Sequence, residues 1–223
     1  MIAALRSQWP LLLMAVAVVA LWSTPVLLPL KLLVVFFHEL SHLLATLLTG
    51  GTPHSLTLTP HQGGALLALG GNRFVVLNAG YLGSLLIGLG LFWAALHSRA
   101  DRWVATGLGA VMLLVAALYV RDGFALVFCT GFGAVLVITG RWLGEAASDV
   151  LLRLIGLTSI VYVPLDIFSD TLARAGPGSD AHMLAQEIGG LTVIWGAIWL
   201  TLSLWAIYLA LRLSLRRALR PAA

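Results

Sequence analysis

The sequence predicts an all-α, multi-pass membrane protein with about six or seven transmembrane helices and one small membrane-associated β-hairpin. Hydrophobic residues make up 60% of the 223 residues, charged residues only 10%, and the mean hydropathy is +1.00. Soluble domains carry about 25% charged residues. Most apolar runs also reach the roughly 20 residues that a spanning helix needs. We therefore expect a single integral membrane domain over residues 1–223.

Seven apolar segments are expected to span the bilayer. A continuous helix over the first two would be about 60 Å long, twice the hydrocarbon thickness. Pro25 and Pro29 lie between these two segments and favour a turn there. The predicted spans are residues 10–29, 31–49, 78–96, 103–120, 123–140, 149–168 and 190–212.

A segment with a different pattern, residues 52–77, follows the second span. Apolar residues alternate at Leu56 and Leu58, Gly63-Gly64 forms a turn signal, and leucines and valines then resume. This pattern predicts a short β-hairpin or a three-stranded sheet. In a bilayer an open sheet edge is tolerated only where protein covers it or where it lines a cavity.

The second span, residues 31–49, contains the motif His38-Glu39-Leu40-Ser41-His42. Histidines four residues apart share one helix face, so both imidazoles can bind one metal ion, which we expect to be Zn²⁺. Glu39 is placed to act as general base on a metal-bound water. A carboxylate in an apolar helix is costly unless it has a function. Cys129 is the only cysteine, so the remaining ligand must be a histidine or a carboxylate.

The third protein ligand of a catalytic zinc site is sought among the aspartates. Asp166 is our first choice, because it follows an uncharged stretch of the helix expected over residues 149–170. Asp170 lies one turn later, as an alternative ligand or a residue that orients a histidine. Asp122 is a further alternative, although a helix cap is the simpler interpretation. Asp180 follows Ser179 and is interpreted as a cap.

Two further residues are weaker candidates for substrate binding. Asn78 begins the third span, whose small residues allow close approach of a neighbouring helix. His54 flanks the predicted hairpin. Helix packing for Asn78 and a solvated loop position for His54 are the simpler explanations.

Four stretches together resemble a known family. The segments FFHELSHLLATLLTGG, NAGYLGS and PLDIFSDT with GSDAHMLAQEIGG are similar to M50 intramembrane zinc metallopeptidases, the site-2 protease group, and most closely to the M50B-like branch. The resemblance implies zinc held by His38, His42 and an aspartate, with Glu39 as base. That group often carries the aspartate in an Asn-Pro-Asp-Gly motif, whereas the only Asp-Gly pair here is Asp122-Gly123.

The expected function is therefore that of an intramembrane zinc metalloprotease acting on transmembrane or membrane-anchored protein substrates, in a bacterial cell membrane. Arginines near the C-terminus suit the anionic surface of the lipid bilayer, and no nucleic-acid partner is expected. The alternatives are an inactive membrane-embedded scaffold or a metal-binding transporter subunit. The presence of Glu39 disfavours the first, and the absence of inverted sequence repeats disfavours the second.

Overall fold

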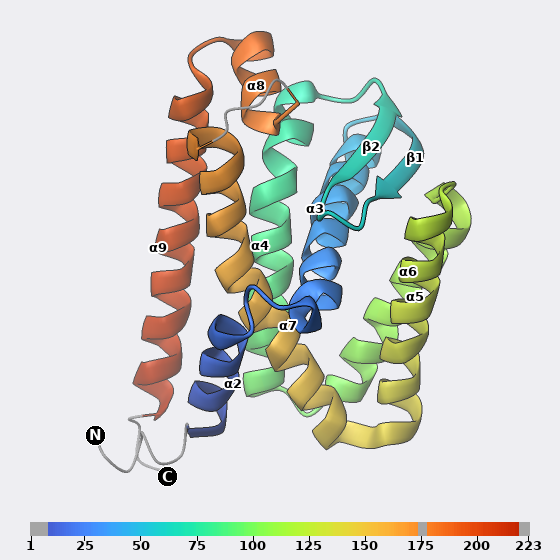
Figure 1. The fold of residues 1–223 in the computed structure, drawn as a ribbon, viewed down its shortest axis with the longest axis vertical. Coiled ribbons are helices and arrows are strands. Elements are labelled where there is room, and N and C mark those ends of the chain that lie inside the picture. Colours follow the sequence, from blue (N-terminus) through green and yellow to red (C-terminus); the bar gives the residue numbers. More distant parts are fainter. Residues whose placement is uncertain (1–8, 174–177, 219–223) are drawn as a thin grey trace.

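The structure is a computed structural model that describes residues 9–173 and 178–218. It confirms the predicted fold class, because long helices dominate the described chain and one two-stranded antiparallel sheet lies towards one end of the bundle (Figure 1). Each predicted span overlaps a helix, but the first, residues 10–29, corresponds to a helix of only 12 residues that ends at Ala20, which is shorter than a membrane span. One further short helix precedes the last span. The helices are α2 (Trp9–Ala20), α3 (Leu28–Leu48), α4 (Arg73–His97), α5 (Asp101–Tyr119), α6 (Gly123–Ile138), α7 (Gly144–Ile167), α8 (Asp180–Ile188) and α9 (Thr192–Ala218).

Within the described residues, five helical stretches are long and apolar enough to cross a membrane, and the chain is a multi-pass membrane protein. One of them, Gly123–Thr171, contains both α6 and α7. The chain reverses between these two helices after a π-helical turn (η2, Thr139–Leu143). Gly144 adopts a φ of +85° there, a left-handed conformation that favours glycine. Figure 1 shows the two helices diverging from this bend.

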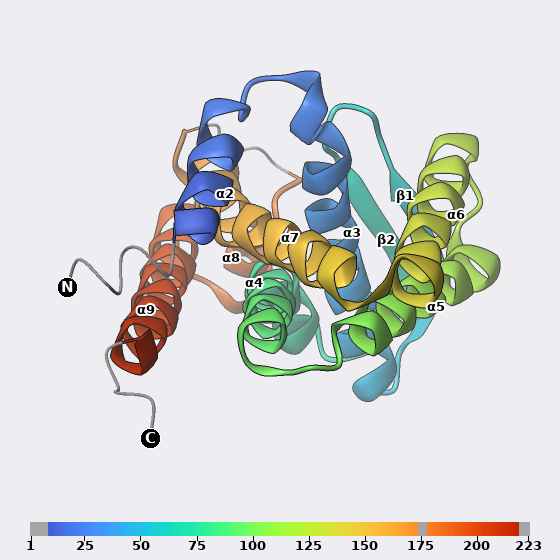
Figure 2. The same ribbon diagram turned by 90° about the horizontal axis from the view of Figure 1, so that it is seen from below.

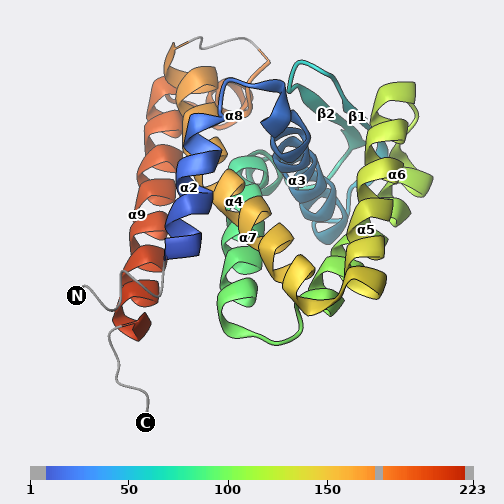
Figure 3. The ribbon, with the colours of Figure 1, turned by 60° about the horizontal axis from the view of Figure 1, so that its bottom comes forward.

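Helix α3 lies in the interior of the bundle. Figure 2 shows it between α7 and the hairpin, with α4 beside it, and Figure 3 shows the same neighbours from another side. Leu33, Phe36 and Phe37 are fully buried within this helix. The motif-bearing helix is therefore shielded from lipid, as a helix with polar side chains requires. It begins at Leu28, three residues before the predicted start.

The hairpin consists of β1 (Thr52–Leu58) and β2 (Gly64–Leu69), paired from Thr52 opposite Leu69 to Leu58 opposite Gly64. The three-stranded alternative is wrong, since α4 already begins at Arg73. The outer edge of β1 is covered by a bridge from Leu56 to Val120, at the end of α5. In the described part of the chain, the other edge of β2 has no strand partner. Residues of β2 instead line a pocket.

Candidate metal centre

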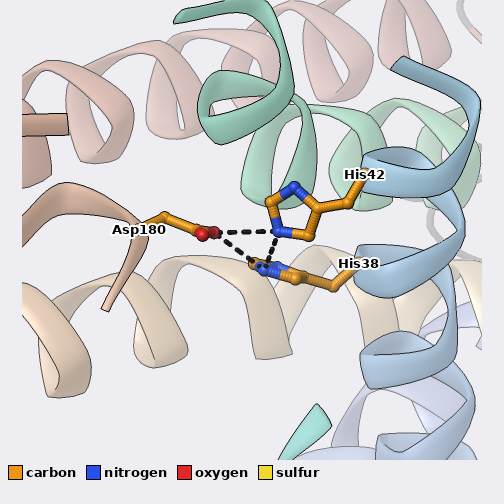
Figure 4. A group of neighbouring side chains, drawn as sticks. All are labelled: His38, His42 and Asp180. Atoms are coloured by element: carbon orange, nitrogen blue, oxygen red, sulfur yellow. Dashed lines mark hydrogen bonds and ion pairs between the residues drawn. The ribbon is translucent and has the colours of Figure 1, made fainter. Parts of the chain in front are cut away.

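Three side chains converge beside α3 (Figure 4). His38 Nε2 lies 2.9 Å from Asp180 Oδ2, and His42 Nε2 lies 3.1 Å from the same oxygen. The two Nε2 atoms are 2.9 Å apart. The histidines come from successive turns of α3, whereas Asp180 is the first residue of α8. Two nitrogens and one carboxylate oxygen, each from a different residue, form a donor set that a divalent metal ion can bind.

The orientation of the His42 ring suits metal binding. Its Nδ1 lies 2.8 Å from the carbonyl oxygen of Val76 in α4. A carbonyl oxygen only accepts, so Nδ1 carries the proton and donates it. Neutral His42 therefore presents an unprotonated Nε2 to the centre. This arrangement, in which a backbone carbonyl fixes the tautomer, is the usual one for metal-bound histidine.

The Asp180 carboxyl is buried and remains charged. Burial alone disfavours the charged form, but His42 and His38, in their protonated form, outweigh it through charge and hydrogen bonds and hold the pKa of Asp180 below its ordinary value. The preceding residue, Ser179, is the actual cap of α8, since its Oγ accepts a hydrogen bond from the His182 N–H. Asp180 is thus free of the capping role expected for it and is available to a cation.

Glu39 lies against the first residue of β2. It is 4% exposed, and a Cβ atom at Gly64 would fall 2.6 Å from its Oε1. A glycine at this position therefore makes room for the carboxylate. Glu39 and the three converging side chains line one pocket of about 600 Å³, together with residues along the length of β2. A buried carboxylate, a candidate metal site and residues of β2 consequently line the same space.

Gly80 allows α4 to pack directly against the two imidazoles. A Cβ at this position would lie 2.5 Å from His38 Nε2 and 2.6 Å from His42 Nε2. Such contacts are too short for a real side chain. The small residues of this segment predict close helix approach, but the sequence does not indicate that the histidines are what α4 approaches.

Gly80→Ala is therefore expected to weaken metal binding by about tenfold or more, because the added methyl must displace the imidazoles from their converging positions. Gly90→Ala is the matched control, since Gly90 lies on the same helix and a methyl group added there would meet no neighbouring element within 4 Å. Metal content of both purified variants would be compared with wild type. Equal metal content in all three would contradict the proposed tight contact.

Asp166 and Asp170 line the same pocket but do not belong to the converging group. The structure thus places Asp180, rather than Asp166, beside the histidines. Asp170, in the π-helical turn η3 (Phe168–Ala173), accepts a hydrogen bond of 3.2 Å from the Tyr81 hydroxyl. The Tyr81 ring in turn contacts His38 edge-on, with 4.6 Å between ring centroids. Asp170 therefore reaches a histidine indirectly, through Tyr81.

The remaining candidates lie outside the pocket. Asp122 caps α6, with its Oδ1 accepting from the Ala125 N–H at 2.8 Å. His54 is exposed on β1. Asn78 accepts a 2.7 Å hydrogen bond from the buried Trp199 indole and thereby ties α9 to α4. None of the three lines this pocket, so the structure favours a cap for Asp122 and helix packing for Asn78, while His54 is solvated on a strand rather than in a loop.

A bundle of long apolar helices thus buries a His-Glu-x-x-His helix, and a carboxylate from another helix lies beside its two histidines. Comparison with known families identifies the branch. The chain belongs to the Peptidase M50B-like family, whose model matches residues 11–210. This match confirms the resemblance seen in the sequence. No curated protein and no solved structure matches the chain.

Proposed function

We propose that this protein is an intramembrane zinc metalloprotease that hydrolyses peptide bonds of membrane-spanning substrates. The observation that carries the proposal is the convergence of His38, His42 and Asp180 in the pocket that also contains Glu39. Membership of a peptidase family supports it. In this proposal Asp180 takes the place of Asp166 as third ligand.

The residues fit a zinc site, because catalytic zinc takes three nitrogen or carboxylate ligands and keeps one position open. When bound, Zn²⁺ would lower the pKa of water and polarise a carbonyl group. Glu39 would accept the proton of the attacking water and return it to the leaving amine. Asp170 would steady His38 through Tyr81. The site is therefore assembled from α3, α4, η3 and α8, four separate elements of the fold.

The free edge of β2 is the proposed binding surface for the substrate. A helical segment hides its carbonyls in internal hydrogen bonds, so it must unwind before hydrolysis. An extended segment could then pair with β2 by β-augmentation. Because β2 begins beside Glu39, such a segment would lie next to the general base. As part of the same proposal the protein works in a bacterial cell membrane, which the compact, cysteine-poor composition favours.

Metal content of the detergent-purified protein tests the site directly. We expect about one zinc per chain in the wild type and its loss in His38→Ala, because two remaining ligands hold the ion weakly. His54→Ala, which changes an exposed histidine outside the pocket, should keep the metal. Elemental analysis measures the zinc content of the wild type and of both variants. Absence of zinc from the wild type after reloading would contradict the proposal.

A further inference from the structure

A second cavity of about 510 Å³ adjoins the pocket that His38, His42 and Asp180 line. Four residues line both spaces, so the two are adjacent: Gln62, Gly63, Asp166 and Asp170. Lys31 and Trp22 line the second cavity but not the first. Gln62 and Gly63 precede β2 directly, so a segment paired with β2 would run past them into this cavity.

Lys31 lies seven residues before His38 and therefore on the same face of α3, about 10 Å away along the helix axis. It is only 8% exposed. Its Nζ donates to the Trp22 carbonyl oxygen at 2.6 Å and lies 4.4 Å from the centroid of the Trp22 ring. An ammonium group has three donors. Among the described residues, no carboxylate forms an ion pair with Lys31, so its contacts to the Trp22 carbonyl and ring leave ammonium donors over.

We propose that the second cavity is a substrate subsite in which Lys31 binds a carboxylate. This inference rests on the proposed function. An extended chain advances about 3.3 Å per residue, so the roughly 10 Å between His38 and Lys31 corresponds to about three residues. Antiparallel pairing with β2, the more stable arrangement, directs the C-terminal side of the substrate towards Lys31. The enzyme thus selects a carboxylate about three residues beyond the scissile bond.

Two acidic residues lie where the two cavities meet, but they do not remove the preference of the second cavity for a carboxylate. Asp166 and Asp170 line both spaces, and each already has an interaction of its own. Asp170, for example, accepts from the Tyr81 hydroxyl. Lys31 and Trp22 belong to the second cavity alone, where a carboxylate would meet the unused ammonium donors. The carboxylate can come from an Asp or Glu side chain or from the C-terminus of the substrate itself.

Equilibrium binding of fluorescent peptides to nanodisc-embedded Glu39→Gln protein tests the subsite without requiring turnover. Three apolar peptides of equal length would be used: one blocked and neutral, one with Glu three residues beyond the central bond, and one ending there with a free carboxylate. A charge-assisted hydrogen bond predicts that at least one acidic peptide binds about tenfold tighter than the neutral one. If the Glu peptide binds more tightly, the carboxylate comes from a side chain. If the peptide with the free end binds more tightly, it comes from the substrate C-terminus.

Variants at Lys31 separate recognition from a structural role. Lys31→Gln keeps a donor for the Trp22 carbonyl but loses the charge, so it should abolish the preference for acidic peptides, and Lys31→Arg should keep it. Arg73→Gln, which removes a cation that lines only the first pocket, is the matched control and should also keep the preference. Equal binding of all three peptides to the protein with Lys31 intact, or a preference that survives in Lys31→Gln, would overturn the subsite. Failure of the wild type to cleave any peptide would instead count against the proposed function.

Discussion

Glu39→Gln is expected to lower peptide hydrolysis by about 10²–10⁴-fold while leaving about one zinc per chain. The glutamine side chain has nearly the same size and would still fit beside Gly64, so the pocket should keep its shape. It has no basic oxygen that can accept a proton from water. Glu39 is also absent from the converging ligand group, so the metal should remain. Cleavage of a single-span substrate in proteoliposomes and elemental analysis of the same preparation measure the two effects together.

Glu187→Gln provides the matched control for this experiment. Glu187 makes only a 3.9 Å ion pair with Arg73, and both side chains are nearly half exposed. Surface pairs of this kind contribute little. The control should therefore cleave at close to the wild-type rate. Wild-type activity in Glu39→Gln would rule out Glu39 as general base, and joint loss of zinc and activity would assign it to the metal site instead.

The helices were predictable because the relevant physics is local. A bilayer demands long apolar runs, and these are visible in the sequence without any knowledge of tertiary contacts. The Pro25 and Pro29 turn and the Gly63-Gly64 reversal are likewise local signals. The pairing of His38 with His42 also follows from helix periodicity alone. These features therefore agree between sequence and structure.

The partner of the two histidines was not predictable in the same way. The cost of an isolated charge drew attention to Asp166, in a long uncharged helix, and that residue does line the pocket. Asp180 instead lies in a polar stretch, where a carboxylate is common and does not by itself indicate a metal ligand. Its position depends on how α8 packs against α4 and α9, which is a tertiary property. The GSDAHMLAQEIGG segment of the family resemblance contains Asp180 and was the one available signal.

Asp180→Asn is expected to weaken zinc binding by more than about 100-fold, whereas Asp166→Asn should bind zinc within about tenfold of the wild type. Both substitutions preserve side-chain size and remove one negative charge. Any difference in zinc affinity between the two variants therefore reflects where each carboxylate lies relative to the metal. Asp180 Oδ2 lies within 3.1 Å of both Nε2 atoms, and the neutral amide would replace the charged oxygen that faces the ion. Asp166 lines the pocket but is not one of the three converging side chains.

Competition with a chelator of known affinity at about pH 7 measures the zinc dissociation constant of each variant. Thermal unfolding in the absence of metal shows whether either protein is damaged for another reason. Metal-free Asp180→Asn should unfold at a lower temperature than the wild type, because it loses the buried ion pairs with His38 and His42, so zinc affinity is compared at a temperature at which all three proteins are folded. Zinc loss in Asp166→Asn with retention in Asp180→Asn would return the third ligand to α7. In that case α8 would close the pocket without contributing to the metal site.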